Sequence, residues 1–372
     1  MARTKIDYGI DLGTTNSAIA RMENGNPIIK KSDTLKDTVP SCVGINKKQA
    51  ITVGDAAMNN LRSDKLRALT NPALSSTNTF IEFKRTMGTD KPYHSSNLNK
   101  SLTSEELSAE VLKKLKSLVT DENIQSIVVT VPAKFTINQK DATSRAAKLA
   151  GFTQCELLQE PIAAAMAYGI NSKEKDGYWL VFDFGGGTFD AALLEVTGGV
   201  MKVIDTGGDN HLGGKNLDYA IVDELILEYL KSTYALNSYL DDESKMEYLR
   251  EALKGFAEEA KIALSFSKSH TVLSNLGDFP EDDNGVEIEI DLTITEETLE
   301  PVVKPIFQKA IDICNEVLQR KNLSGTDLGA LILVGGPTYS PILRRMLKQN
   351  VSQKVDTSID PMTAVANGAA LF

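Results

Sequence analysis

Two matched glycine-rich turns between short strands constrain this chain more than any other feature. The strands are predicted over residues 6–12 and 17–22 around Gly13-Thr14-Thr15-Asn16, and over residues 178–184 and 189–196 around Gly185-Gly186-Gly187-Thr188. Each turn follows an aspartate, Asp11 in the first and Asp183 in the second. An ordinary β-hairpin is the simpler interpretation of one such turn, whereas two copies favour an internal duplication with a shared function.

The two turns present groups that bind phosphate. Glycines leave consecutive backbone N–H groups free to converge on phosphate oxygens, and Thr14, Thr15 and Thr188 add hydroxyl donors. Two aspartates that face each other beside such turns suit a magnesium ion that keeps most of its water. We therefore expect phosphate and Mg²⁺ to meet in one cleft.

Other motifs that bind phosphate or metals, or that carry covalent catalysis, are not matched. Residues 208–215 fail the Walker pattern, because Asp209 and Asn216 stand where glycine and Ser or Thr are needed. Asp190 breaks the dinucleotide-binding glycine pattern after the second turn, and a strand follows it instead of a helix. The three histidines show no metal-ligand spacing, no GxSxG elbow is present, and the three cysteines form no CxxC pair and are predicted to be buried thiols.

Size and charge narrow the class of protein. A chain of 372 residues is long enough for two lobes. No apolar run approaches the roughly 18 residues of a membrane span, and the N-terminus has no secretory pattern, which predicts a cytoplasmic protein without a membrane segment. The formal net charge of -10 opposes binding to nucleic acid or anionic membranes. The acidic cluster at residues 281–283 lies in turn chemistry and is expected to be a solvated loop.

Apolar periodicity and capping signals predict an alternating α/β chain. Thr103 and Glu106 form a predicted capping box, and Gly151 and Gly169 stand where helices end. Helices are predicted over residues 103–116, 138–150, 161–168, 216–234, 243–265, 296–320 and 364–371 and from Pro341 onward, with strands over 127–131, 272–276, 286–292 and 330–334. Alternation of strands and helices favours α/β lobes, and the helices and strands after residue 216 indicate a separate subdomain.

Six longer motifs resemble those of DnaK-type chaperones, the seventy-kilodalton heat-shock branch of the actin-like ATPase superfamily. They lie, in the order of that family, at residues 9–17, 129–135, 159–165, 182–190, 208–214 and 333–338. Phe83-Lys84-Arg85 followed by Gly88 matches the stretch that separates these chaperones from actins and sugar kinases. The resemblance covers essentially the whole chain.

The resemblance implies an α/β, bilobal actin-like ATPase (ribonuclease H-like) fold, in which each lobe has a large α/β subdomain and a smaller one. Lobe I would span residues 1–185, with an inserted subdomain at about 40–115, and lobe II residues 186–359, with one at about 224–300. Residues 360–372 would form a C-terminal helix that returns to lobe I. Mg-ATP would lie at the base of the cleft between the lobes.

The resemblance also assigns roles to residues. ATP or ADP, Mg²⁺ and K⁺ are the implied cofactors, with Asp11, Asp183 and Asp190 at the metals, Asp190 near a monovalent cation or the attacking water. Lys84 would lie on the γ-phosphate side, Glu160 and Thr188 would position the water, and Pro132 would act in a relay between lobes. The implied catalytic residues are Asp11, Lys84, Glu160, Asp183 and Thr188, and the implied nucleotide-binding residues are Gly13, Thr14, Thr15, Asn16, Gly185, Gly186, Gly187, Thr188, Gly213, Gly214, Glu258, Lys261, Ser265, Gly335, Gly336 and Thr338.

The residues alone leave simpler interpretations open. Without the resemblance Lys84 is a solvated lysine, and Glu160 is an acid that complements a helix N-terminus. Glu258, Lys261 and Ser265, three and four apart, would form an exposed helix face. The chain also departs from the family at several positions. Tyr339 stands where the family usually has arginine, and Met362 and Thr363 stand where it usually has acidic residues, which bears on adenine stacking. Lys140 replaces an arginine of the relay between lobes, Lys134 replaces an aromatic residue, and Lys215 replaces an acidic residue, which bears on the coupling of the lobes.

The expected function is slow ATP hydrolysis by the regulatory domain of a DnaK-type chaperone. Its nucleotide state would control a peptide-binding domain outside this chain, and the implied partners are a J-domain cochaperone, a nucleotide-exchange factor and unfolded polypeptides. A monomer is expected. The alternatives are a nucleotide sensor with little turnover, an actin-like filament ATPase and a small-molecule kinase.

Overall fold

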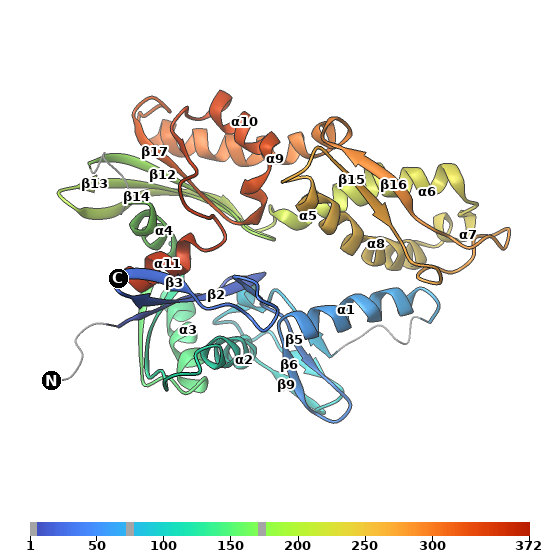
Figure 1. Cartoon of the computed structure of the whole chain (residues 1–372), viewed down its shortest axis with the longest axis horizontal. Coiled ribbons are helices and arrows are strands. Elements are labelled where there is room, and N and C mark those ends of the chain that lie inside the picture. Colours follow the sequence, from blue (N-terminus) through green and yellow to red (C-terminus); the bar gives the residue numbers. More distant parts are fainter. Residues whose placement is uncertain (1–5, 72–77, 170–175) are drawn as a thin grey trace.

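Two large sheets form the frame of the computed structural model, which describes residues 6–71, 78–169 and 176–372 (Figure 1). The first sheet has the order β11-β10-β1-β2-β3, and β4 pairs with β2 outside this path. Its strands are β1 (Tyr8–Asp11), β2 (Asn16–Glu23), β3 (Asn26–Ile29), β4 (Val39–Pro40), β10 (Ser126–Val131) and β11 (Gln154–Gln159). β1 runs antiparallel to β2 and parallel to β10, so Asp11 stands at the end of a central strand.

The second sheet repeats the start of the first. Its order is β14-β13-β12-β17-β18, with β12 (Gly177–Phe184), β13 (Phe189–Thr197), β14 (Val200–Asp209), β17 (Leu328–Val334) and β18 (Val355–Asp356). β12 runs antiparallel to β13 and parallel to β17, as β1 does to β2 and β10. Both predicted hairpins are therefore confirmed, and their sheet partners match as well.

Two helices of small residues, α4 (Glu160–Gly169) and α11 (Ala364–Leu371), lie between the two sheets (Figure 1). α11 packs on α4, β1 and β2, while α4 also contacts β12 and β17. A hydrophobic cluster joins Val128 of the first sheet to Val181 and Ile332 of the second through these helices. The remaining helices of the frame are α2 (Ser104–Ser117) and α3 (Ile137–Leu149) beside the first sheet and α9 (Glu296–Arg320) and α10 (Pro341–Asn350) beside the second.

A smaller unit is attached to each sheet. The first contains β5 (Val43–Ile45), β6 (Ile51–Val53), α1 (Asp55–Ala68), β7 (Thr79–Phe80), the 3₁₀ turn η2 (Phe83–Thr86), β8 (Tyr93–Ser95) and β9 (Lys100–Leu102). The second contains α5 (Gly214–Ile221), the π-helical segment η3 (Val222–Ile226), α6 (Leu227–Thr233), α7 (Asn237–Leu240), α8 (Glu243–Ala263), β15 (Ser269–Leu273) and β16 (Asp291–Thr295). The 3₁₀ turn η4 (Gly336–Tyr339) follows β17. α1 and α8 contact each other, so the two smaller units meet at the side of the molecule drawn at the right in Figure 1.

Most predicted elements are confirmed, including the capping box of Thr103 and Glu106 at the start of α2. The predicted helix over 216–234 forms as three consecutive helical segments, α5, η3 and α6. The strand predicted over 286–292 is wrong in position, because residues up to 290 form a loop and β16 begins at Asp291. Side chains hold that loop, since Asp282 accepts from the Val286 N–H at 2.9 Å and Ser274 Oγ from the Ile290 N–H at 2.8 Å.

Two smaller findings bear on the remaining expectations. Cys42 and Cys314 are buried as predicted, whereas Cys155 is partly exposed.

β12 hydrogen-bonds within the second sheet, which favours a lobe boundary before Gly177 over the predicted one after residue 185. The lobe and subdomain limits stay proposals. Among the described residues, no helix combines the length and the apolar character needed to cross a bilayer.

The packing of α4 on α11 gives a stability prediction. A Cβ at Gly368 would overlap the backbone carbonyl of Ala163, and backbone cannot move aside as a side chain does. We expect Gly368→Ala to lower the free energy of unfolding by about 3 kcal/mol, measured by denaturant titration. The control is Gly255→Ala within α8, where the nearest atoms would be 3.9 Å from the new Cβ. That variant is expected to be neutral or stabilising, because alanine favours helix, and equal effects at both positions would contradict the packing argument.

Candidate functional site

The first glycine turn lies against the second, and the segment after β14 lies against the second turn from that turn's own half of the molecule. A Cβ at Gly186 would overlap the Thr15 side chain, and one at Gly213 would overlap the backbone of Gly187. The segment after β14 is fixed on the second turn by backbone hydrogen bonds, from the Gly214 N–H to the Gly185 carbonyl at 2.9 Å and from the Lys215 N–H to the Gly186 carbonyl at 2.7 Å. Glycine at these positions is therefore a packing requirement.

Carboxyl groups gather around one buried lysine beside these turns. Lys84 of η2 is 6% exposed, and its Nζ lies 2.6 Å from Glu160 Oε1 at the start of α4. Asp11 and Asp183, from corresponding strand ends, both act electrostatically on Lys84. Thr130 of β10 donates its hydroxyl to Asp11 Oδ1 at 3.3 Å. The structure thus brings together four of the five predicted catalytic residues, and it rejects the solvated interpretation of Lys84.

Burial and like charges disfavour the ionised form of the carboxyl groups in this cluster. Burial, followed by repulsion from Glu160, raises the pKa of Asp11 to about 7 and that of Asp183 well above its usual value. The same two causes raise the pKa of Asp190 to about 6, although Lys134 Nζ lies 3.8 Å from its Oδ1. Burial opposes the charged form of Lys84, but Glu160 and Asp11 reverse this effect and raise its pKa.

The donor set of this cluster fits a hydrated divalent cation. Oxygen donors suit Mg²⁺, which keeps several waters and uses few protein ligands. Within residues 6–71, 78–169 and 176–372, no group of three or more His, Cys, Asp or Glu side chains is arranged to hold an ion directly. Asp11 and Asp183 offer carboxylate oxygens of the kind that such an ion accepts.

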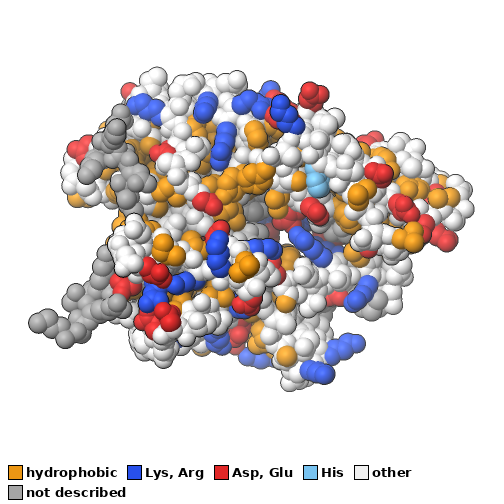
Figure 2. All heavy atoms as spheres, in the orientation of Figure 1, with side chains coloured by type: hydrophobic (Ala, Val, Ile, Leu, Met, Phe, Trp, Pro, Cys, Tyr) orange, Lys and Arg blue, Asp and Glu red, His pale blue; other side chains and the backbone are white. Residues whose placement is uncertain are grey.

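A cavity of about 560 Å³ opens beside the turns. Acidic and basic side chains gather along the line where the upper and lower halves meet on the face drawn in Figure 2. Nine of the predicted nucleotide-binding residues line the cavity, namely Thr14, Thr15, Asn16, Gly186, Gly214, Glu258, Lys261, Ser265 and Gly336. The volume lies in the range of small-molecule sites. Glu160, Asp183 and Asp190 line a separate, smaller pocket together with Pro132.

The other predicted binding residues shape backbone near the cavity. Thr338 is fully buried and donates its hydroxyl to the Gly335 carbonyl at 2.7 Å, so this hydroxyl is engaged within η4. Gly335 has φ 90° and packs against the Phe184 carbonyl, which only glycine tolerates easily. The Gly185 N–H donates to the Thr188 carbonyl at 2.9 Å and closes the second turn. Gly13 donates its N–H to Ser17 Oγ at 3.2 Å in the first.

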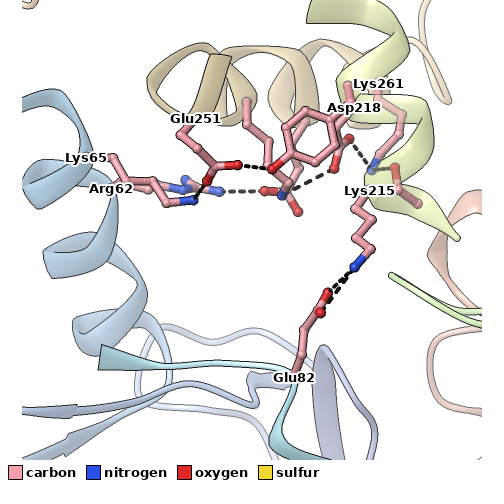
Figure 3. A network of polar contacts seen from close by, with 11 residues as sticks. Arg62, Lys65, Glu82, Lys215, Asp218, Glu251 and Lys261 are labelled. Atoms are coloured by element: carbon pink, nitrogen blue, oxygen red, sulfur yellow. Dashed lines mark hydrogen bonds and ion pairs between the residues drawn. The ribbon is translucent and has the colours of Figure 1, made fainter. Parts of the chain in front are cut away.

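Ion pairs cross the upper part of the cavity, and sequence reasoning missed several of their members (Figure 3). Lys65 of α1 points to Glu251 of α8, with 2.5 Å between Nζ and Oε2, and Arg62 lies 3.1 Å from Glu258. No motif marks Arg62 or Lys65, and their spacing of three on a helix is the only signal that could have found them. Two further pairs line the same space, Lys215 with Glu82 at 3.2 Å and Lys261 with Asp218 at 2.5 Å.

These pairs keep the carboxylates of α8 ionised. Burial alone would raise the pKa of Glu258, but Lys261, Lys254 and Arg62 outweigh it and lower the pKa. Lys65 does the same for Glu251, which also accepts the hydroxyl of Tyr219. α1 contributes apolar contacts as well, since Leu66 and Leu69 pack against the core of the second sheet. The contact of α1 with α8 thus combines charge pairing with burial.

The lowered pKa of Glu251 predicts how this contact responds to pH. A carboxylate with a depressed pKa stabilises the folded state above its unfolded pKa of about 4.3, and this contribution is lost as the pH falls through the folded value. We expect Glu251→Gln to lower the free energy of unfolding by about 1 kcal/mol at pH 7 and by much less at pH 3.5. Denaturant titrations at the two pH values measure this. Glu247→Gln, at an exposed position of the same helix, is the control, and an equal cost at both pH values would contradict the ion-pair explanation.

Comparison with known proteins places the chain in a family. The family model described as Hsp70 protein matches residues 7–372. The chain is 37% identical to the chaperone protein DnaK of Methanothermobacter thermautotrophicus, over all of this chain and 60% of the relative, and 36% identical to that of Ureaplasma urealyticum, over 99% and 58%. With the DnaK of Nitrosopumilus maritimus it shares 34%, over 98% and 55%. The chain therefore spans a little over half the length of these curated relatives. The match confirms the predicted resemblance and the actin-like ATPase fold class.

Proposed function

Because the chain belongs to the Hsp70 family, we propose that it binds ATP in the cavity beside the two glycine turns and hydrolyses it slowly. The observation that carries this proposal is the contact of the first turn with the second, where the Thr15 side chain lies against Gly186, together with the buried Lys84–Glu160 ion pair on which Asp11 and Asp183 act. Phosphoryl transfer to water depends on positioning and charge neutralisation more than on covalent help. These residues can supply both.

Each part of the cluster has a task in such a reaction. The backbone N–H groups of the turns and the hydroxyls of Thr14 and Thr15 hold phosphate oxygens. Lys84 places an ammonium group beside the transferred phosphoryl group, and Glu160 fixes that ammonium through the 2.6 Å contact. Glu160 is also proposed to accept a hydrogen bond from the attacking water and so to orient it. Thr188, whose carbonyl closes the second turn, is proposed to help position that water.

Mg²⁺ would be held through its waters by Asp11 and Asp183, and when bound it would neutralise charge on the phosphates. Support comes from the raised pKa of both aspartates, since burial and repulsion from Glu160 disfavour their ionised form and a cation would favour it. K⁺ is proposed near Asp190 because burial and repulsion from Glu160 likewise raise the pKa of this carboxyl group. On the nucleoside side, Glu258, Lys261 and Ser265 line the cavity and are proposed to face the ribose and base.

The function of the longer protein is proposed from its relatives, whose name is chaperone protein DnaK. We propose that the nucleotide state of this chain controls a peptide-binding domain that lies outside it. A J-domain cochaperone, a nucleotide-exchange factor and unfolded polypeptides are the proposed partners. The monomeric state and the cytoplasmic location expected from the sequence stay predictions.

Single-turnover hydrolysis of labelled ATP with Mg²⁺ and K⁺ tests the proposed reaction. We expect slow release of phosphate from the unmodified chain and at least about a hundredfold slower release from Lys84→Ala, because the ammonium acts on the transition state. Both proteins should retain ATP, since most of the phosphate contacts come from backbone and hydroxyl groups. Retention shows that the variant is folded.

The control for this experiment is Lys113→Ala, which removes an exposed ammonium that pairs with Glu110 on α2. It should hydrolyse ATP at the rate of the unmodified chain. Release from Lys84→Ala at that rate would overturn the role of Lys84. An unmodified chain that retains ATP but releases no phosphate above the blank would overturn hydrolysis and favour the sensor alternative.

Removal of the metal gives a second prediction. We expect the affinity of the unmodified chain for ATP, measured by calorimetry, to fall at least about tenfold when EDTA replaces Mg²⁺. Asp183→Asn should bind ATP equally well with and without Mg²⁺, because it lacks one of the two carboxylates that hold the hydrated ion. The control is Asp205→Asn. Asp205 lies on β14 and pairs with Arg320 of α9, and this variant should keep the full Mg²⁺ dependence. An unchanged dependence in Asp183→Asn would remove this aspartate from the proposed metal site.

A further inference from the structure

An ion pair crosses the cavity from one smaller unit to the other. Lys215 of α5 and Glu82, the residue before η2, point toward each other in Figure 3, and Lys215 Nζ lies 3.2 Å from each carboxylate oxygen of Glu82. Both side chains line the cavity, and their positions are 133 residues apart in the chain. The pair therefore connects η2, in the first half of the molecule, with the start of α5, in the second.

A second contact attaches η2 to the second glycine turn. Arg85 donates from its guanidinium to the Gly187 carbonyl, and its Nη1 lies 3.4 Å from Glu82 Oε2. A Cβ at Gly187 would overlap this guanidinium. The Lys215 N–H in turn donates to the carbonyl of Gly186 in the same turn. We call Glu82, Arg85 and Lys215 the clasp, because together they fasten η2 onto the second turn.

Lys84 lies between the two residues of η2 that belong to the clasp. The backbone there is ordered, since the Arg85 N–H donates to the Glu82 carbonyl and the Met87 N–H to the Lys84 carbonyl, each at 3.1 Å. Glu82 has φ 56°, a left-handed conformation that a residue with a side chain keeps when its surroundings hold it. The position of the Lys84 ammonium is therefore tied to the second turn through a short, ordered segment.

The clasp is strong enough to bias the position of η2 but not to lock it. Its side chains are partly exposed, with 29% for Glu82, 20% for Arg85 and 27% for Lys215, and ion pairs of this kind contribute modestly to stability. The Lys84 side chain, by contrast, is buried against Glu160 of the first half. Opening of the two halves can thus break the clasp and shift η2 without unfolding either half.

We infer that Glu82 and Lys215 are positioning residues for the proposed hydrolysis. The clasp holds the Lys84 ammonium beside the transferred phosphoryl group only while the two halves of the molecule are closed on each other. The inference rests on the proposed function, because it concerns the reaction in which Lys84 acts. Displacement of a group that acts on the transition state slows the reaction, while binding of the substrate in its ground state is largely kept.

Single-turnover hydrolysis and calorimetric binding of ATP by the 372-residue chain, both with Mg²⁺ and K⁺, test the clasp. Lys215→Met and Glu82→Gln should each slow phosphate release about threefold to tenfold and leave the affinity for ATP within about threefold. The double variant should be no slower than the slower single variant, because both residues act through one contact. Lys215→Arg should keep the unmodified rate, since it keeps the charge opposite Glu82. The control is Lys231→Met, which removes an exposed ammonium paired with Glu228 on α6.

The Lys84→Ala background decides whether the clasp acts through Lys84. In that background Lys215→Met should change the remaining rate by less than about twofold, because the group that the clasp positions is gone. Equal slowing by Lys215→Met in both backgrounds would show that Lys215 acts independently of Lys84 and would refute the positioning role.

The other outcomes separate this inference from the function on which it rests. If Lys215→Met and Glu82→Gln hydrolyse ATP at the unmodified rate, the clasp has no part in the reaction and the proposed function stands. If either variant loses affinity for ATP as strongly as it loses rate, its residue binds the nucleotide and the positioning role is refuted. If the unmodified chain releases no phosphate, the proposed hydrolysis fails and the inference fails with it.

Discussion

The close approach of two glycine turns is the constraint on which the rest of the site depends. Gly186 lies against Thr15, and Gly213 lies against Gly187, without room for a Cβ at either position. The turns come from corresponding hairpins in two sheets, and α4 and α11 between those sheets hold them at this distance. Packing in the interface of the sheets, where Gly368 meets the Ala163 carbonyl, thus determines whether backbone donors from both halves can reach one phosphate chain.

The geometry that brings the turns together also gathers charged side chains beside them. Strand ends that bring the turns together also bring Asp11 and Asp183 together, and the helix that separates the sheets begins with Glu160. Lys84 favours the ionised carboxylates, but burial and repulsion from Glu160 outweigh it and raise the pKa of Asp11 and Asp183. A cluster of this kind is poorly satisfied by the chain alone and becomes better satisfied with a cation. The cost of assembling it is consistent with a site that is completed by its ligands.

The sequence predicted those parts of the site that depend on local backbone. The hairpins, the aspartates before the turns and the helices that carry Glu160 and Glu258 all follow from short patterns, and the structure confirms the placement of these elements. The role of Lys84 required the family resemblance, because nothing in residues 83–88 shows that this lysine is buried against Glu160. Arg62 and Lys65 could not be found, since their importance arises from the docking of α1 on α8, where the paired residues are 196 and 186 positions apart in the chain. The strand expected over 286–292 failed for a related reason, because Asp282 and Ser274 take the hydrogen bonds of that backbone.

The contacts that close the cavity differ in kind from those that build its floor. At the floor the Thr15 side chain lies against Gly186 and the backbone of Gly213 lies against that of Gly187, so a substitution at Gly186 or Gly213 disturbs the second turn. The upper contact between α1 and α8 consists of partly exposed ion pairs with two apolar side chains beneath them, and each such pair contributes little on its own. Opening the upper contact therefore requires far less free energy than separating the turns. Separation of α1 from α8 would therefore widen the cavity beside Thr14 and Thr15, while the frame of the two sheets that holds Asp11 and Asp183 stays intact.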